Sequence, residues 1–416
     1  VQGYTGVGGI IGMMYNGAVS RSYNLGEIRS TRKSSSSAGS VDPLNMGGIV
    51  GDSTEWTNAK AVIYDVYNAG QIGDDKFDYR GRHVGGVVGR LSGYLEKAYN
   101  TADIYNGFNV VGGVVGYWTA GSVSNVFNTG NITVVNYNDA RSQVGGLVGA
   151  ADISKGLLTL SKSYNLGTIR SFRPFIKNQT GKSELAGDHS VAGFVGELVN
   201  WENNTNSTLT INNSYTLGNI FAATATDTNN ESWTSSSGAY LDLGRNIANQ
   251  SQFVSTNNAY VHMRETDGLG EIIKPDPSFP TSAVHLIWTD DGIDEDWGNL
   301  FDEDTDLGDF TGDWRLYAGG LPILNVFKPY AQEYIDNQIK DSDVTIQYGT
   351  AYNPLLSILT VKNKDGITLD WAQLKIAGAG GLAVYGANLT LTNFTQDASS
   401  YFGGTIFTDG QFTIDS

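Results

Sequence analysis

The densest group of chemically active side chains in this chain is acidic. Residues 290–313 contain 11 Asp and Glu and neither Lys nor Arg. Within this segment, Asp302, Asp304 and Asp306 occupy alternate positions, and Asp313 is the twelfth residue counted from Asp302, which is the spacing of oxygen ligands in a calcium-binding loop. The glycine that such a loop requires is displaced, and its bidentate glutamate is replaced by aspartate. Structural calcium is therefore the one cofactor that the sequence suggests, and a solvated acidic loop is the alternative.

Aromatic side chains form a second group that could contact a ligand. Trp56 and Trp201 each lie five residues after the last glycine of a glycine-rich phrase, and Trp118 lies two residues after such a glycine. If the three indoles point outward from one side of the molecule, they can stack on sugar rings. The alternative interpretation is that each indole covers the apolar base of its own loop.

Basic side chains form a third group. Arg29, Arg32 and Lys33 follow one copy of a repeated phrase, and Arg170 and Arg173 follow another copy. On a chain with a formal net charge of −17, such patches could bind sulfated or sialylated glycans. Solvated loops are the alternative.

Catalytic motifs are largely missing from the sequence. None of the four histidines is followed by Glu, no G-x-S-x-G sequence occurs, and cysteine is absent. A polysaccharide-degrading enzyme would need carboxylates on neighbouring repeats of one face. The corresponding polar position is acidic only in Glu27 and Asp103, which are two repeat units apart in sequence order, with the unit of Gln71 between them. We therefore expect no enzyme activity, with a polysaccharide-degrading enzyme as the alternative.

The aromatic and basic groups must be positioned by a repeated two-part unit. A glycine-rich phrase occurs six times, as VGGIIG (7–12), MGGIVG (46–51), VGGVVG (84–89), VGGVVG (111–116), VGGLVG (144–149) and VAGFVG (191–196). Each copy is followed by a second phrase, SYNLGEI (22–28), VYNAGQI (66–72), AYNTADI (98–104), VFNTGNI (126–132), SYNLGTI (163–169) or SYTLGNI (214–220). Short constant phrases with variable spacing predict stacked strands with insertions at particular corners, and no helical period is present.

Within a repeat, the second phrase predicts a strand with a bend near its asparagine. Tyr23 and Ile28 are expected to share the interior while Ser22 and Glu27 face outward, and asparagine tolerates a left-handed corner. Stacked asparagines would form an internal amide ladder, and the paired glycines would let backbones approach closely. The structural positions of the repeat are Gly9, Asn24, Gly48, Asn68, Gly86, Asn100, Gly113, Asn128, Gly146 and Asn165.

The paired phrases, VGGLVG followed by SYNLGTI, resemble the GLUG motif of large bacterial surface proteins. The segment W-R-L-Y-A-G-G-L-P-I-L (314–324) resembles the sequence that often closes such arrays. The resemblance implies a filamentous-haemagglutinin-like adhesin of the two-partner-secretion or autotransporter type. It also implies an all-β, right-handed parallel β-helix. The motif is architectural and implies no particular ligand.

Three sections follow from these patterns. We expect a β-helix over 1–220, a loop insertion and acidic Trp-containing cap or junction over 221–335, and a C-terminal β-solenoid-like section over 336–416, with a short helix or linker at Tyr330–Lys340. The chain starts at Val1, almost directly on a repeat, and is interpreted as a fragment of a longer protein.

The composition limits the classes of partner that this chain can bind. The acidic balance argues against nucleic acid, and no apolar run reaches the roughly 20 residues that cross a bilayer. The repeats predict a monomeric, non-enzymatic rod, and the resemblance to GLUG-motif proteins implies a place at the bacterial cell surface. Its loops 29–45, 170–190 and 221–257 would contact host glycan, host protein or another bacterium. A purely structural spacer is the remaining alternative.

Overall fold

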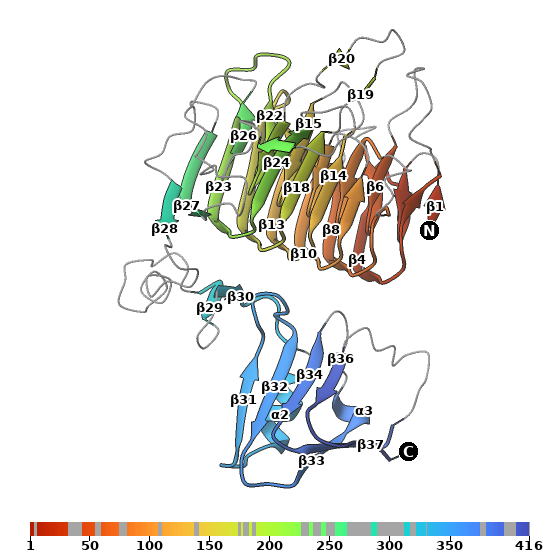
Figure 1. Cartoon of the computed structure of the whole chain (residues 1–416), viewed down its shortest axis with the longest axis vertical. Coiled ribbons are helices and arrows are strands. Elements are labelled where there is room, and N and C mark those ends of the chain that lie inside the picture. Colours follow the sequence, from red (N-terminus) through yellow and green to blue (C-terminus); the bar gives the residue numbers. More distant parts are fainter. Residues whose placement is uncertain are drawn as a thin grey trace. The chain divides into compact units, whose positions relative to one another are not determined.

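The protein was analysed as a computed structural model that describes residues 1–3, 6–31, 44–54, 60–74, 81–106, 110–136, 141–173, 176–177, 183–184, 189–225, 233–235, 243–246, 254–263, 284–288, 312–316, 322–329, 331–374, 380–394 and 405–415. The chain divides into two compact units, Val1–Asp294 and Glu295–Ser416. Both are built mainly of strands (Figure 1). The prediction of an all-β fold class is confirmed, since strands dominate the described part of both units.

In the first unit, corresponding strands of successive repeats pair in parallel. The first part of the glycine-rich phrase forms a sheet of β2 (Val7–Gly8), β6 (Asn45–Gly47), β9 (His83–Gly85), β12 (Val110–Gly112), β15 (Ser142–Gly145) and β21 (His189–Ala192). The strands after the Asn turn form another, β11 (Ile104–Asn106), β14 (Ile132–Val135), β18 (Ile169–Arg173) and β24 (Ile220–Ala225), which β25 (Trp233–Ser235) extends in antiparallel fashion.

The largest sheet contains the end of the glycine-rich phrase and the start of the second phrase. Its strands are β3 (Ile11–Met13), β4 (Ala18–Asn24), β7 (Val50–Ser53), β8 (Ala61–Asn68), β10 (Val88–Asn100), β13 (Val115–Asn128), β16 (Val148–Asp152), β17 (Leu157–Asn165), β22 (Val195–Val199), β23 (Thr208–Thr216), β26 (Leu243–Asn246), β27 (Val254–Met263) and β28 (Val284–Trp288). Two strand pairs flank these sheets, β1 (Gln2–Gly3) with β5 (Arg29–Ser30) and β19 (Ile176–Lys177) with β20 (Ser183–Glu184).

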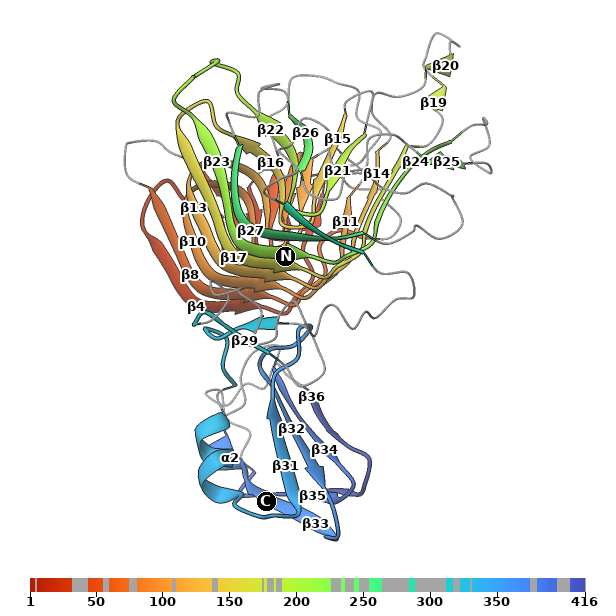
Figure 2. The same ribbon diagram turned by 90° about the vertical axis from the view of Figure 1, so that its left-hand side faces the viewer.

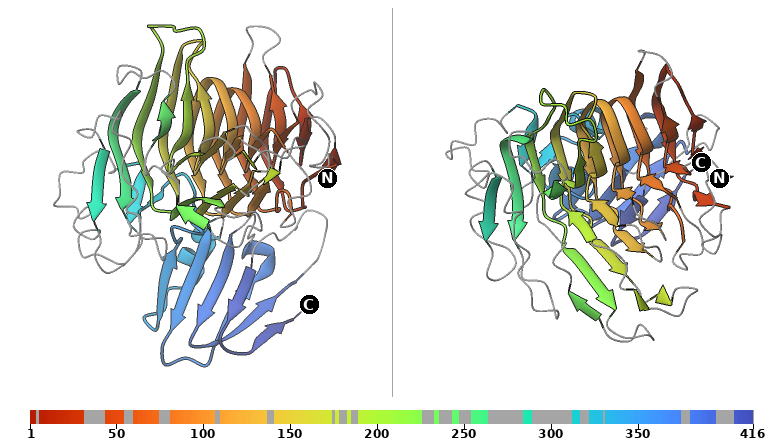
Figure 3. Two further views of the ribbon diagram at one scale, coloured as in Figure 1. Left: turned by 45° about the horizontal axis from the view of Figure 1, so that its top comes forward. Right: turned by 90° about the horizontal axis from the view of Figure 1, so that it is seen from above.

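The register places equivalent residues of successive repeats in columns. Val84 pairs with Val111, and Val111 with Val144. Seen along the stack in Figure 2, equivalent strands lie one behind another, and seen from above in Figure 3 they lie side by side in the order of the repeats. Because side chains alternate along a strand, each column faces one environment throughout the stack.

Two apolar clusters fill the stack. One contains the Val or Met that opens each glycine-rich phrase together with the Ile that closes the second phrase, such as Val84 and Ile104. The other contains the branched pair after the two glycines, such as Val87 and Val88, with the inward residues of the following strand, such as Leu95. The glycine-rich phrase therefore separates the two clusters and supplies side chains to both.

The asparagine column forms the predicted internal amide ladder. Asn24 Nδ2 donates to Asn68 Oδ1 (2.8 Å), Asn68 to Asn100 (2.8 Å), Asn100 to Asn128 (2.9 Å) and Asn128 to Asn165 (2.8 Å). Each of these amides also donates to the backbone carbonyl two residues later, as Asn100 does to Ala102 (2.8 Å). The column is buried, so these bonds satisfy amide groups that water cannot reach.

The glycines of the first phrase are explained by this ladder. A Cβ atom added to Gly86 would lie 2.0 Å from the carbonyl oxygen of Gly113 and 2.5 Å from Asn100 Cγ. Gly48, Gly113 and Gly146 meet Asn68, Asn128 and Asn165 in the same way. The two phrases of a repeat therefore recur together because the second glycine of one packs against the asparagine of the other.

The left-handed corner differs from its expected position. Positive φ occurs three residues before the asparagine, as at Asp65 (55°) and Lys97 (51°), and not at the asparagine itself. The equivalent residues of the other repeats are Arg21, Asn125, Lys162 and Asn213. The asparagine instead turns the chain through its side-chain bond to the backbone, which needs no left-handed residue.

The tyrosine of the second phrase also differs from expectation. Tyr67 lies between Val66 and Asn68, which both face the interior, so alternation directs its ring to the opposite face. The rings form their own stack of Tyr23, Tyr67, Tyr99, Phe127, Tyr164 and Tyr215, with centroids 4.6–5.1 Å apart. Tyr23 and Ile28 therefore do not share one interior, whereas Ile28 is fully buried as predicted.

The stack extends past the sixth repeat. Strand β27 pairs in parallel with β23 and aligns Tyr260 with Tyr215. Strand β28 then pairs with β27. Most of 221–335 lies outside the described residues, so the expected three-section division stays a prediction.

The second unit is also a parallel stack, with one antiparallel strand at its edge. Its sheets are β31 (Val344–Tyr348), β32 (Leu356–Val361), β34 (Gly381–Tyr385) and β36 (Thr405–Thr408), and β33 (Gly366–Asp370), β35 (Asn388–Thr392) and β37 (Phe412–Ile414). Helices α2 (Gln332–Gln338) and α3 (Trp371–Leu374) pack on its core, and β29 (Trp314–Leu316) forms a hairpin with β30 (Pro322–Leu324). The segment Tyr330–Lys340, which was expected to be a short helix or linker, contains the helix α2.

Candidate functional site

Trp201 is the expected ligand residue that the structure places at the surface. It lies in the turn between β22 and β23, and 65% of it is exposed. Its backbone N–H donates to Ser154 Oγ (2.8 Å), which belongs to the equivalent turn of the preceding repeat. The indole is therefore exposed while its backbone is held by a neighbouring repeat.

A carboxylate and two hydroxyls adjoin this indole. Asp152 accepts from Ser154 Oγ (2.5 Å) through one oxygen and from the Tyr117 hydroxyl (2.9 Å) through the other. Asn204 Nδ2 donates to the Ser154 carbonyl (3.2 Å) and ties the tip of the Trp201 turn to the same place. We call Trp201, Tyr117, Asp152, Ser154 and Asn204 the Trp201 site.

The Tyr117 hydroxyl stays protonated over the ordinary pH range. Burial raises its pKa, the nearby Asp152 carboxylate raises it further, and a side-chain hydrogen bond from Trp201 partly opposes these effects. Behind it, the His83 ring stacks on the Tyr117 ring with centroids 4.6 Å apart. Burial, followed by the charges of Arg82 and Arg90, lowers the pKa of His83 to about 3, so the imidazole is neutral at physiological pH.

A second buried group supports His83. Its Nδ1 lies 2.7 Å from Asn45 Oδ1, and Asn45 Nδ2 donates to Asp52 Oδ2 (2.5 Å). These side chains come from the positions just before and just after a glycine-rich phrase. They hold the Tyr117 ring from behind and leave its hydroxyl facing Asp152.

This arrangement can bind a polyhydroxylated ring. An exposed indole face offers apolar contact, and polar groups at its border offer fixed donors and acceptors, which is the composition of specific ligand sites. Tyr117, Asp152 and Ser154 were not identified from the sequence. The available signal is that variable polar residues flank the otherwise constant glycine-rich phrases.

Trp118 does not belong to a ligand site, and the expectation for it was wrong. It is fully buried in the core, and its Nε1 donates to the Ala120 carbonyl (3.0 Å). The register pairs it with Leu91 on one side and Ala151 on the other, so it occupies an interior column where the small alanine leaves room for the indole. Trp56 lies outside the described residues.

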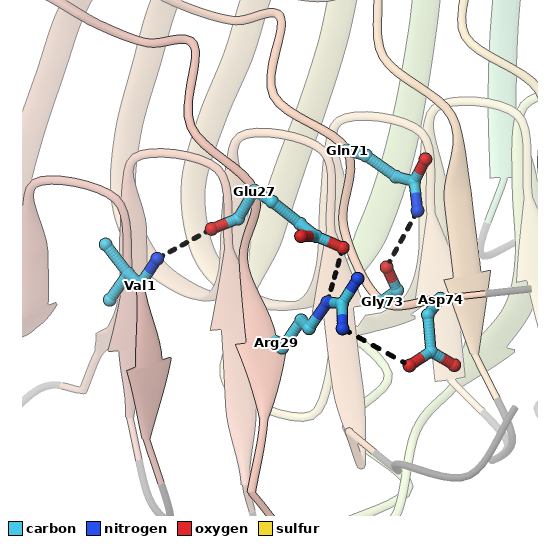
Figure 4. Close-up of polar contacts among 6 residues, drawn as sticks. All are labelled: Val1, Glu27, Arg29, Gln71, Gly73 and Asp74. Carbon is cyan, nitrogen blue, oxygen red and sulfur yellow. Dashed lines mark hydrogen bonds and ion pairs between the residues drawn. The ribbon is translucent and has the colours of Figure 1, made fainter. Parts of the chain in front are cut away.

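Arg29 is held by carboxylates at the first repeat. It forms an ion pair with Glu27, and its Nη1 lies 3.9 Å from Asp74 (Figure 4). The amino group of Val1 donates to the Glu27 carbonyl (2.6 Å) in the same region. The charge of Arg29 is thus largely compensated within the chain. Arg32 and Lys33 lie outside the described residues.

Arg170 and Arg173 occupy a strand, where a loop was expected. In β18 the residues Ile169, Ser171 and Arg173 face inward, and Arg173 is fully buried. The expectation that Arg173 is a surface ligand residue was therefore wrong, because β18 continues far enough to turn it inward. Arg170 faces outward and lies over the Phe221 ring, 5.4 Å from its centroid.

In the third and fourth repeats the variable polar position before the final Ile binds the backbone of the following repeat. Asp103 Oδ1 accepts from the backbone N–H of Asn131 (2.8 Å), and Asn131 Oδ1 accepts from the backbone N–H of Thr168 (3.2 Å). Asp103 also accepts from Asn131 Nδ2 (3.1 Å). Asp103 and Asn131 thus each accept a backbone N–H of the next repeat, whereas Glu27 pairs with Arg29.

The calcium expectation falls mostly on residues that the structure does not describe, namely Asp302, Asp304 and Asp306. Asp313 is described, and its backbone carbonyl accepts from Asn325 N–H (2.7 Å) in the hairpin of the second unit. Within the described ranges no group of three or more His, Cys, Asp or Glu is arranged to hold a metal ion.

Comparison with known proteins returned no matching family model, no matching curated protein and no matching solved structure. Among the described residues, no helix is long and apolar enough to span a bilayer. The function must therefore be argued from the site itself.

Proposed function

We propose that this chain is part of a non-enzymatic bacterial surface adhesin that binds glycan at the Trp201 site. The GLUG-like phrases support a filamentous-haemagglutinin-like protein. On this proposal the stack is a right-handed parallel β-helix at the cell exterior, and the partner is a glycan of a host surface, a matrix protein or another bacterium.

The observation that carries the proposal is the combination of exposure and support at Trp201. A side chain that merely covered its own loop would bury most of its surface, yet 65% of this residue is exposed. Its turn is anchored by Ser154 and Asn204 across two repeats. A preordered aromatic surface loses little conformational entropy on binding, which favours affinity.

The stacked repeats support the same proposal. The amide ladder and the paired rings connect successive repeats at every step, so the Trp201 turn stands on a stiff base. For the enzyme alternative, Asp103 is the relevant carboxylate, and its Oδ1 is already occupied by Asn131. This supports a structural role for Asp103 and adds nothing to a catalytic one.

The test is a glycan array probed with the wild-type chain and with Trp201→Ala. Removing an aromatic anchor at the centre of a binding site costs about 2 kcal/mol, or about 30-fold in Kd. Trp201→Phe should retain part of the affinity because it keeps a ring. Met13→Ala, at an exposed apolar residue of the first repeat, is the matched control and should bind as wild type.

Two results would contradict the proposal. One is glycan binding that Trp201→Ala leaves unchanged. The other is release of product from an acidic polysaccharide by the wild-type chain but not by Asp103→Asn, which would establish the enzyme alternative.

A further inference from the structure

A second aromatic surface lies on the outer face of the β8 and β10 strands. Val62, Tyr64 and Tyr94 are 43%, 40% and 44% exposed, unlike most large apolar residues of the stack. Val62 pairs directly with Tyr94 across the two strands, and Tyr64 pairs with Glu96. The three apolar side chains therefore form one continuous patch, which we call the Tyr64–Tyr94 platform.

The strand alternation fixes the direction of these side chains. Ile63 and Leu95 lie between the platform positions and are buried in the core. The left-handed residues Asp65 and Lys97 end the outward face immediately after Tyr64 and Glu96. The rings thus belong to a regular part of the sheet and cannot turn inward without displacing the core.

Small residues border the platform along the stack. Ala18 and Ser20 of β4 pair with Val62 and Tyr64. On the other side, Ser122 of β13 pairs with Tyr94, and Ser124 follows it on the same face. The rings therefore project from a low surface of small side chains, which leaves space for a chain-like ligand that runs along the stack axis.

The charges at this surface are more positive than those of the chain as a whole. The Lys60 ammonium lies 5.6 Å from the Tyr94 ring centroid, and no carboxylate of the described residues pairs with it. Arg21 is exposed next to Ser20 and, among the described residues, is likewise without an ion-pair partner. Asp65 is already paired with Lys97 (3.0 Å), and the neighbouring Glu96 forms no ion pair within the part of the chain that the structure describes.

We propose that the Tyr64–Tyr94 platform binds an anionic polysaccharide, in which pyranose rings stack on the two tyrosines and a carboxylate or sulfate group pairs with Lys60. Lys60 and Arg21, which pair with no carboxylate of the described residues, favour an anionic polymer over a neutral one on a chain of net charge −17. Glu96 accepts hydrogen bonds from sugar hydroxyls. This platform shares no residue with the Trp201 site, so the inference goes beyond the proposed function.

The test measures binding of polygalacturonate, dextran sulfate and neutral dextran to the whole chain by affinity electrophoresis. At least one of the two anionic polymers should bind more tightly than neutral dextran. The double variant Tyr64→Ala/Tyr94→Ala should weaken that binding at least tenfold, and Lys60→Gln should weaken it several-fold while reducing its salt dependence. The anionic polymer that binds identifies the acidic group.

Matched controls separate this result from unfolding and from the other site. Tyr352→Ala removes a 59% exposed tyrosine of the second unit and should leave binding unchanged, as should Trp201→Ala. Circular dichroism should show every variant folded, because the platform side chains lie outside the core. The inference is overturned if neither anionic polymer binds, if neutral dextran binds equally well, or if the double variant binds as wild type. It is also overturned if Tyr352→Ala or Trp201→Ala weakens binding as much as the double variant.

Discussion

Truncation of one amide in the buried asparagine column should destabilise the stack far more than truncation of an exposed asparagine. Asn100 Nδ2 donates to Asn128 Oδ1 (2.9 Å) and to the Ala102 carbonyl (2.8 Å), and Asn100 Oδ1 accepts from Asn68 Nδ2 (2.8 Å). Asn100→Ala removes these three bonds and also the longer bond from the Ala102 N–H to Asn100 Oδ1 (3.4 Å). It leaves an Asn68 N–H and the Asn128 carbonyl oxygen without their partner in a buried column.

The magnitude follows from those two orphaned groups. Each buried polar group left without a partner costs about 1–3 kcal/mol, and the small cavity adds to this, so we expect a loss of about 3–5 kcal/mol. Asn131→Ala removes the same number of atoms, but its bonds to Asp103 and Thr168 are exposed. We expect it to cost about 0.5 kcal/mol or less.

The assay is urea unfolding of both variants followed by circular dichroism. Asn100→Thr is a third variant, because Thr216 occupies this column in the sixth repeat and accepts from Asn165 there (3.4 Å). It should lose less stability than Asn100→Ala. Equal losses for Asn100→Ala and Asn131→Ala would refute the ladder as a source of stability.

Four further outcomes are expected. Gly86→Ala should cost at least about 3 kcal/mol, because its Cβ would overlap the Gly113 carbonyl, whereas Gly26→Ala, whose nearest contact would be at 3.6 Å, should cost under about 1 kcal/mol in the same urea assay. Trp118→Ala should cost about 3–5 kcal/mol in urea while leaving glycan binding of the folded protein unchanged. Burial lowers the pKa of His83 to about 3 from 6.5. Between pH 3 and pH 6.5 the His83 ring is therefore protonated in the unfolded state and neutral in the folded state. Stability should therefore fall as pH falls from 6.5 towards 3, and His83→Gln should flatten that decline in thermal melts at pH 7, 5 and 4. A calcium chelator should lower the melting midpoint if the acidic segment holds calcium, and an unchanged midpoint would remove the calcium prediction.

Much of the repeat could be predicted from its residues. The paired phrases predict columns, because identical short strands that stack in register bring Asn68, Asn100 and Asn128 onto one line. A buried column of amides can satisfy itself only by bonding along the column and to its own backbone. The glycines follow from the same contact, since a side chain at Gly86 would overlap Asn100 and its neighbour.

The candidate site could be predicted only in part. Trp201 was identified from its distance to a glycine-rich phrase, and the same argument wrongly placed Trp118 at the surface. Spacing alone cannot separate them, because a shift of one residue moves a side chain to the other face of a strand. Trp118 lies within β13, in register with the buried Leu91, whereas Trp201 lies in the turn after β22, and the sequence spacing does not show that difference.

The stacking of β repeats around an internal amide column follows from the paired phrases, because that information is local and recurs in every copy. Which variable side chains meet depends on the three-dimensional fold. Tyr117 and Asp152 come from different repeats and touch because β13 and β16 are paired, and Arg173 is buried because β18 continues past the expected turn. Contacts between non-equivalent positions depend on loop lengths and on which face of a strand each side chain takes. The repeated phrases give no information about either.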